Sequence, residues 1–277
     1  MGEHTVLVLG GSKSGKTLYG AQLTIRLMKN PGALRFYAQP DNLELFDEPM
    51  QLLGRGRLSK HTPFGVNKDV VLPIELPKGN RVRVVWPDYG GEQVTQMLRG
   101  RTVSAGWRDR TVTSDGWLLM VRPELFRESR DLLHRPLKDI QPKDVSDGLP
   151  EWVPEAGVVE LLQILLFIRR LGRETRIRNP KLAVGITCWD EWHASIKSGV
   201  PHEELRRLAP MLLNFVEALW EPSCVTVFGI SSLGKALSAD VDDEQFVDEG
   251  AHRQGFIVLP SGKKSDDLTW PLAKLLE

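Results

Sequence analysis

Eight residues near the N-terminus, Gly10 to Thr17, restrict the possible fold more than any other part of the chain. They read Gly-Gly-Ser-Lys-Ser-Gly-Lys-Thr, which matches a glycine, four residues and then Gly-Lys-Thr. The β-branched, apolar run Thr5 to Leu9 precedes them, and the helical apolar spacing of Leu18 to Met28 follows. A glycine-rich turn is the alternative, but strand, loop and helix in this order favour a phosphate-binding loop in an α/β fold.

The residue types in this loop suit a triphosphate with bound magnesium. Glycines let consecutive backbone N–H groups turn toward phosphate oxygens, and the helix N-terminus adds its partial positive charge. Lys16 would supply a full charge to the β and γ phosphates and act in catalysis, while Thr17 would offer its hydroxyl to magnesium. The expected nucleotide-binding residues of the loop are Gly10, Gly11, Ser12, Lys13, Ser14, Gly15, Lys16 and Thr17.

The rest of the chain alternates between strand and helix patterns, which predicts a parallel sheet covered on both faces within one domain, residues 1–277. Two extended segments joined by Pro-Lys-Gly-Asn predict a hairpin. Two stretches, about 122–154 and 235–255, are expected to be insertions. The expected strands are 70–76, 81–86, 117–121, 182–187, 225–230 and 256–259, the expected helices are 155–172 and 203–220, and the segment 268–276 closes the chain.

An acidic residue at the end of a buried strand is the expected second anchor for magnesium. Asp88 follows the second hairpin strand and opens Asp-Tyr-Gly-Gly-Glu, where Gly91 could offer its N–H to a γ-phosphate. A polar turn after an edge strand is the alternative. Thr62, shortly before the hairpin, is the best-placed threonine for a further magnesium contact, so the expected metal ligands are Thr17, Thr62 and Asp88.

With these two motifs the chain resembles the Ras-like (TRAFAC-type) P-loop GTPases, and two later segments continue the resemblance in the family's order. Thr187-Cys188-Trp189-Asp190 is similar to the base-reading segment, and Ile230 to Gly234 is similar to the loop whose backbone touches the base oxygen. The resemblance implies a three-layer sandwich with a mixed, mostly parallel sheet and long insertions. It also implies GTP and Mg²⁺ as cofactors, with Thr187, Asp190, Ser231, Ser232 and Leu233 around the guanine base.

Asp190 can read guanine because its two oxygens can accept from N1–H and from the exocyclic amine, an arrangement that adenine lacks. Asp190 could instead cap the following helix. The family usually has lysine where this chain has Cys188, and that departure weakens the expected preference for GTP.

The expected catalytic residues are Lys16, Glu92 and Gln93. The family places a water-orienting glutamine where this chain has Glu92, and Gln93 comes one place later. A carboxylate there would repel γ-phosphate oxygens, so unaided hydrolysis should be slow. Arginines after this segment either form a solvated basic face or supply a charge-stabilising group; they are Arg99, Arg101, Arg108 and Arg110.

The segment from Pro260 to Leu272 resembles the C-terminal signature of bacterial double-GTPase proteins, which occur as pairs in GTPase-associated conflict systems. This resemblance implies a prokaryotic defence component, with antiviral defence as its setting, that works beside a second GTPase-like protein or an effector.

Composition restricts partners and location. The 36 basic and 36 acidic side chains cancel, so no overall field draws the chain onto nucleic acid or a membrane. The longest apolar stretch, Val158 to Ile168, is far shorter than the roughly 20 residues that span a bilayer, and no export signal is recognisable. We expect a cytoplasmic protein. A GTPase switch, an ATPase and a nonhydrolysing nucleotide-gated scaffold (a pseudo-GTPase) stay open as functions.

Overall fold

The computed structural model describes residues 4–29, 34–59, 69–75, 79, 81–87, 91–122, 124–127, 154–172, 175–192 and 198–277; at 91–93, 95–96, 127 and 154 it describes the backbone only. These residues form a nine-stranded sheet in the order β2-β3-β4-β1-β5-β6-β7-β8-β9. The central strands run parallel: β4 (Arg81–Trp86), β1 (His4–Leu9), β5 (Gly116–Val121), β6 (Lys181–Ile186) and β7 (Val225–Ser231). The antiparallel edges are β2 (Arg35–Phe36), β3 (Val70–Glu75), β8 (Phe256–Val258) and β9 (Lys264–Ser265).

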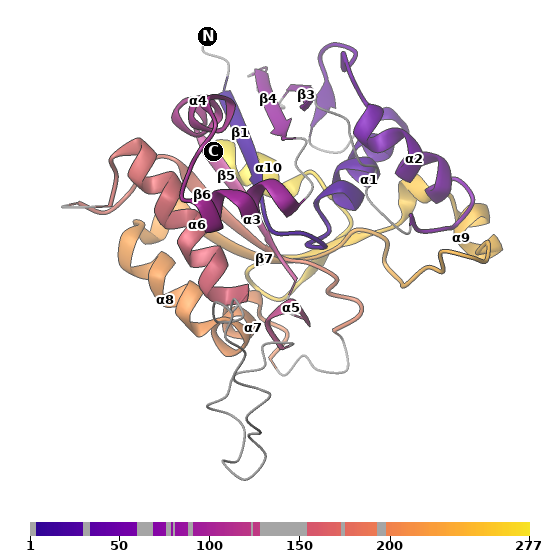
Figure 1. The fold of residues 1–277 in the computed structure, drawn as a ribbon. Helices are drawn as coiled ribbons and strands as arrows, with labels where there is room; N and C mark the ends of the chain where they lie inside the picture. Colours follow the sequence, from indigo (N-terminus) through magenta and orange to yellow (C-terminus); the bar gives the residue numbers. More distant parts are fainter. Residues whose placement is uncertain are drawn as a thin grey trace, which may run out of the picture.

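Helices cover both faces of this sheet, as Figure 1 shows for α1 and α2 on one side and α6 and α8 on the other. The first face is covered by α1 (Lys16–Lys29), α2 (Glu44–Leu53), α9 (Glu244–Glu249) and α10 (Trp270–Leu276). The second is covered by α3 (Gly91–Gly100), α4 (Ala105–Thr113), α6 (Pro154–Arg169), α7 (Pro201–Leu208) and α8 (Pro210–Leu219), with the short α5 (Glu124–Arg127) beside α6. The expected three-layer α/β architecture is confirmed.

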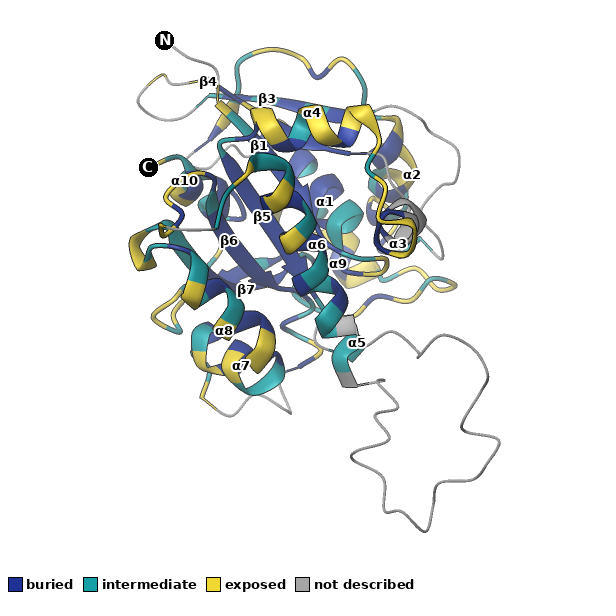
Figure 2. Cartoon of the chain, turned by 60° about the vertical axis from the view of Figure 1, so that its left-hand side comes forward, coloured by how far each residue is buried: buried dark blue, intermediate teal, exposed yellow. Residues whose placement is uncertain are grey.

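The central strands are buried on both faces because both faces carry helices. In β1, Val6 and Val8 join the core under α1 and α2, whereas Leu7 and Leu9 join the core under α6 and α8. Figure 2 shows the same pattern, with buried strands in the middle and exposed residues on the outer helix faces. Among the described helices, none combines the length and hydrophobicity needed to cross a bilayer.

Most expected elements are found, and the differences have local causes. The helix expected over 203–220 is two helices, because Ala209 precedes Pro210 and takes a non-helical conformation (φ −141°, ψ 64°). The expected loop 235–255 contains α9, which Asp243 caps by accepting from Phe246 N–H at 2.8 Å. Of the other expected insertion, 122–154, only Arg122, α5 and residue 154 lie within the described residues.

Candidate functional site

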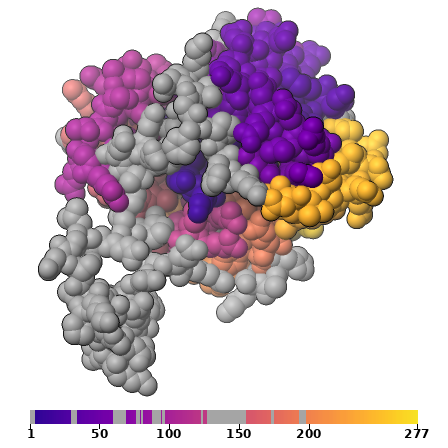
Figure 3. Space-filling model, turned by 45° about the vertical axis from the view of Figure 1, so that its right-hand side comes forward, coloured from indigo at the N-terminus to yellow at the C-terminus, as the bar shows by residue number. Residues whose placement is uncertain are grey.

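Several of the expected site residues meet at the carboxyl edge of the parallel strands. Gly10 follows β1, Thr187 follows β6, and Ser231 ends β7. Parallel strands end at a common edge, which is where open α/β sheets bind ligands. In Figure 3, a small indigo area from the N-terminal segment reaches the surface near the centre of the face shown, bordered by magenta and orange segments.

The loop between β1 and α1 is shaped by two glycines that no other residue could replace without strain. Gly10 has φ +146°, and a Cβ there would lie 2.5 Å from Met120 O and 2.7 Å from Ser14 Oγ. Gly15 has φ +83°. Ser14 is buried, and its hydroxyl donates to Gly11 O at 2.9 Å. A Cβ on Gly11 would meet no atom of the described residues within 4 Å, so they leave the loop open at this position.

Lys16 begins α1 and reaches back across this loop. Its ammonium donates to Gly10 O at 2.8 Å and to Gly11 O at 2.6 Å, and it lies 3.2 Å from Ser14 Oγ. Burial of the ammonium lowers the pKa of Lys16 from 10.5 to about 7. The lysine therefore has a suppressed positive charge beside the open part of the loop, and an anion there would restore that charge.

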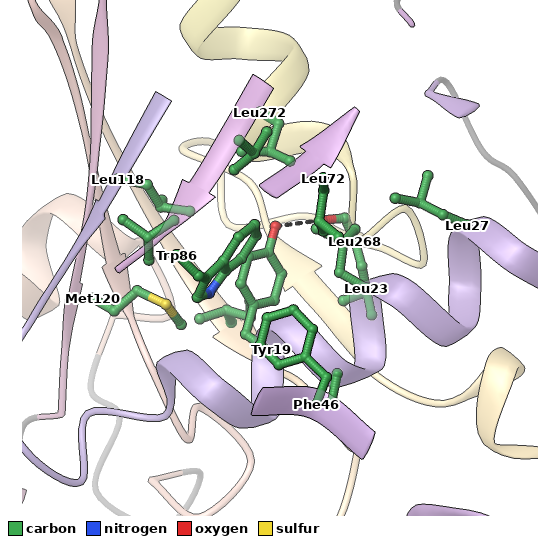
Figure 4. Close-up of a cluster of buried hydrophobic side chains, with 14 of the residues drawn as sticks. Tyr19, Leu23, Leu27, Phe46, Leu72, Trp86, Leu118, Met120, Leu268 and Leu272 are labelled. Carbon is green, nitrogen blue, oxygen red and sulfur yellow. Dashed lines mark hydrogen bonds between the residues drawn. The ribbon is translucent and has the colours of Figure 1, made fainter. Parts of the chain in front are cut away.

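Trp86, the last residue of β4, anchors the start of α1. Its indole N–H donates to Lys16 O at 3.2 Å, and its ring packs near Tyr19 and edge-on against Phe46. Tyr19 in turn donates its hydroxyl to Leu268 O at 2.9 Å (Figure 4). The first turn of α1 is thus fixed to the strand that leads to Asp88.

The expected base-reading segment lies beside the phosphate loop. A Cβ on Gly15 would lie 3.6 Å from Thr187 Cβ, although the two residues are far apart in sequence. Thr187 is buried, and both its N–H, at 2.8 Å, and its hydroxyl, at 3.1 Å, donate to Val121 O. Thr187 therefore ties the end of β6 to the end of β5 directly beside the loop.

Asp190 lies in a tight turn that its neighbours hold. Glu191 N–H donates to Cys188 O at 3.0 Å, and Cys188 has φ +55°. Trp189 is buried, its N–H donates to Ile230 O at 3.0 Å, and its ring occupies the space where Gly229 lacks a Cβ. Asp190 itself is half-buried, and its carboxylate makes no hydrogen bond or ion pair with any described residue.

The loop after β7 is held close to this turn. Ser231 is buried, and its hydroxyl accepts from Gly234 N–H at 2.8 Å. Gly255, with φ +88°, packs so closely that a Cβ would lie 2.4 Å from Ser232 O. Leu233 is buried at the same bend. This loop can offer backbone groups to a ligand, but the Ser231 hydroxyl already accepts from Gly234 N–H.

The other expected site residues are only partly visible. Thr62 and Asp88 lie outside the described residues, and Gly91, Glu92 and Gln93 form the start of α3 with only their backbone described. Of the arginines that follow, Arg110 is engaged: its guanidinium makes a bidentate ion pair with Asp69, at 2.5 and 2.8 Å. This pair ties α4 to the residue just before β3.

Two contacts near the site were not expected from the sequence. Trp86 was expected only as the end of a strand, whereas its indole N–H donates to Lys16 O at 3.2 Å. Arg122 was assigned to an insertion, whereas its guanidinium contacts Glu191 Oε2 at 2.8 Å, next to Asp190. Both contacts join residues distant in sequence.

Comparison with known proteins finds one matching family and several solved structures of similar fold. The family model described as Double-GTPase 1 matches residues 7–275, and no curated protein matches. The chain is similar to the Arl6 BBS3 small GTPase of Trypanosoma brucei with bound GppNp (16% identity over 91% of this chain and 99% of that one, TM-score 0.41). It is also similar to the signal recognition particle receptor SRb-GTP/SRX complex of Chaetomium thermophilum (15% identity over 90% of this chain and 98% of that one, TM-score 0.40). It spans only 26% of the bacterial selenocysteine-specific elongation factor EF-Sec (12% identity, 84% of this chain, TM-score 0.34).

Proposed function

Because the chain belongs to the Double-GTPase 1 family, we propose that it is a magnesium-dependent GTP-binding switch that hydrolyses GTP slowly. One observation carries this proposal: the turn proposed to read the base begins directly beside the phosphate loop. Thr187 lies beside Gly15, and three residues later Asp190 has a carboxylate without a partner among the described residues. A single ligand with an anionic end and a hydrogen-bond-donating base would suit this pair of features.

The loop from Gly10 to Gly15 would bind the phosphates through its backbone N–H groups and through the N-terminus of α1. Lys16 would exchange its bonds to Gly10 and Gly11 carbonyls for bonds to the β and γ phosphates. In that exchange the ammonium gains anionic partners that offset the desolvation of its charge. The shape of the loop supports this role, because Gly11 leaves open space beside the lysine.

The turn at Asp190 would select the base. Its two carboxylate oxygens would accept from N1–H and the exocyclic amine of guanine, and adenine offers no such pair of donors. Backbone groups of Ser231, Ser232 and Leu233 would face the base oxygen. Thr187 would keep the turn and the phosphate loop in register.

Magnesium bound here would supply positive charge beside the phosphates. Thr17, in the first turn of α1, would supply one oxygen, and the sequence motifs propose Thr62 and Asp88 for the rest. Gly91 would donate its N–H to the γ-phosphate. This chain has Glu92 where the Ras-like GTPases have glutamine, with Gln93 next to it, so we propose that unaided hydrolysis is slow and that a partner stimulates it. We propose that this partner is a second GTPase-like protein in a prokaryotic defence system.

The nucleotide that copurifies with the protein tests this proposal. The expected result is GDP or GTP after denaturation and chromatography of the extract. ATP or ADP would favour the ATPase reading, and an empty protein with no affinity for added GTP would favour the scaffold reading.

Asp88→Asn is expected to weaken magnesium-dependent GTP binding more than magnesium-free binding, because the proposed carboxylate acts on the ion and its waters. The loss should be about tenfold with magnesium, as for one hydrogen bond to a charged group. Titrations of labelled GTP with excess magnesium and with a chelator measure both affinities. Equal losses in the two conditions would mean that Asp88 only shapes its turn.

The lowered pKa of Lys16 predicts that GTP binding takes up protons. Above about pH 7 the empty loop holds a mostly neutral lysine, and bound phosphates should raise the pKa again. The contribution of Lys16 to the affinity should therefore be constant below about pH 7 and fall by up to about tenfold per pH unit above it. Calorimetry at about pH 8 in two buffers of different ionisation enthalpy should show uptake of up to about one proton. Identical heats in both buffers would contradict the prediction.

A further inference from the structure

Arg122 lies between α5 and the turn that carries Asp190. It directly follows β5, and its guanidinium is held between two carboxylates. Its Nε donates to Glu124 Oε2 at 3.0 Å, and its terminal nitrogen lies 2.8 Å from both Glu124 Oε2 and Glu191 Oε2. Glu124 belongs to α5, whereas Glu191 closes the turn that carries Asp190.

From this geometry we propose that Arg122 is a positioning residue for guanine recognition, which fixes the Asp190 turn through its ion pair with Glu191. The inference rests on the proposed function, because it assumes that Asp190 reads the base. It goes further by assigning base selectivity to a residue on a different strand, 69 positions from its partner.

The turn that carries Asp190 is fixed in the core at its start, so the ion pair with Arg122 is needed only at its end. Trp189 is buried against Gly229 and bonded to Ile230, so the start of the turn is fixed in the core. The end of the turn has Glu191 near the surface, where its side chain is 32% exposed. The arginine side chain is 27% exposed, so the pair is partly shielded from water and can hold the turn better than a fully solvated pair.

Arg122 also stabilises the turn by offsetting the negative charges of its carboxylates. Asp190 and Glu191 are adjacent carboxylates, which repel one another. Burial, followed by the charge of Glu191, raises the pKa of the Cys188 thiol to about 12, so this thiol is neutral at neutral pH. Arg122 therefore offsets the carboxylates rather than a thiolate, and without it Asp190 would turn away from Glu191.

The test compares GTP with inosine triphosphate, which lacks the exocyclic amine but keeps N1–H. The ratio of their dissociation constants measures one hydrogen bond to Asp190. We expect Arg122→Gln and Glu191→Gln each to lower the preference for GTP on the order of tenfold, the effect of losing one such bond. Arg122→Lys should keep part of the preference, since it keeps the charge near Glu191.

Two control variants separate positioning from general effects. Glu124→Gln removes the other partner of the same guanidinium, and Arg35→Gln breaks the ion pair with Glu75 at the far edge of the sheet. Both should keep the wild-type ratio within about twofold, as for exposed pairs that do not touch the turn. Thermal unfolding of each variant establishes that it is folded. If Arg122→Gln does not fold, the comparison relies on Glu191→Gln alone.

The outcomes distinguish this inference from the proposed function. A wild-type protein with no preference for GTP over inosine triphosphate or ATP would overturn the role of Asp190 itself. A wild-type preference that Arg122→Gln and Glu191→Gln both retain would overturn only the positioning role. Equal losses of affinity for GTP and inosine triphosphate in these variants would also overturn the positioning role, because such losses indicate a general electrostatic effect on the phosphates.

Discussion

Replacing Lys16 with alanine is expected to weaken GTP binding about 100-fold or more while the protein stays folded. The interactions that we propose Lys16 to make, and that the variant would lose, are charge-assisted bonds to two phosphates. Each is worth about 1.5 to 3 kcal/mol, and each 1.4 kcal/mol is about tenfold in affinity. Titration of labelled GTP with magnesium measures the loss.

The stability of this variant should change little, for a reason visible in the structure. Lys16 donates to Gly10 O and Gly11 O, but burial of its charge opposes those bonds, as its lowered pKa indicates. The two effects partly cancel, so we expect a change in the free energy of unfolding below about 1 kcal/mol, or roughly 2 to 4 °C in melting temperature.

Lys29→Ala is the matched control, because Lys29 is an exposed lysine at the other end of the same helix. It should leave GTP affinity unchanged within about twofold, as for surface substitutions away from a site. If Lys16→Ala bound GTP as tightly as Lys29→Ala, the loop from Gly10 to Thr17 would not be the phosphate site.

Local signals in the sequence predicted much of the fold. The strand before Gly10, the helix after Gly15 and the antiparallel pair β3 and β4 each depend on residues close together in the chain, and each was expected at nearly its observed bounds. Helices with weak local signals were missed. In α4 only Trp107 and Thr111 are buried, so the helix has little apolar periodicity, and α2 contains Pro49.

The candidate site was predictable in its parts but not in its assembly. Each motif could be recognised from its own residues, yet the position of Thr187 beside Gly15 depends on β6 lying next to β5, which lies next to β1. Likewise, Arg122 has no local signal, because its partner Glu191 is brought close only by that strand order. Pairings across a sheet are set by the whole fold, and no window of sequence contains them.

Asp190→Asn is expected to weaken GTP binding and strengthen binding of xanthosine triphosphate. Xanthine has an oxygen where guanine has its amine, and the amide of asparagine can donate to that oxygen, whereas a carboxylate cannot. Leaving one buried polar group opposite another that cannot pair with it costs about 1 to 3 kcal/mol, so GTP affinity should fall roughly tenfold or more.

The variant should fold normally, because the Asp190 carboxylate has no partner among the described residues, while the turn is held by Trp189 and by the Glu191 ion pair. Competition of GTP, ATP and xanthosine triphosphate against a labelled nucleotide gives the order of preference. Asp109→Asn, at an exposed aspartate on α4, is the matched control and should keep the wild-type order. If Asp190→Asn also kept that order, Asp190 would not read the base, and the ATPase or scaffold reading would replace the GTP switch.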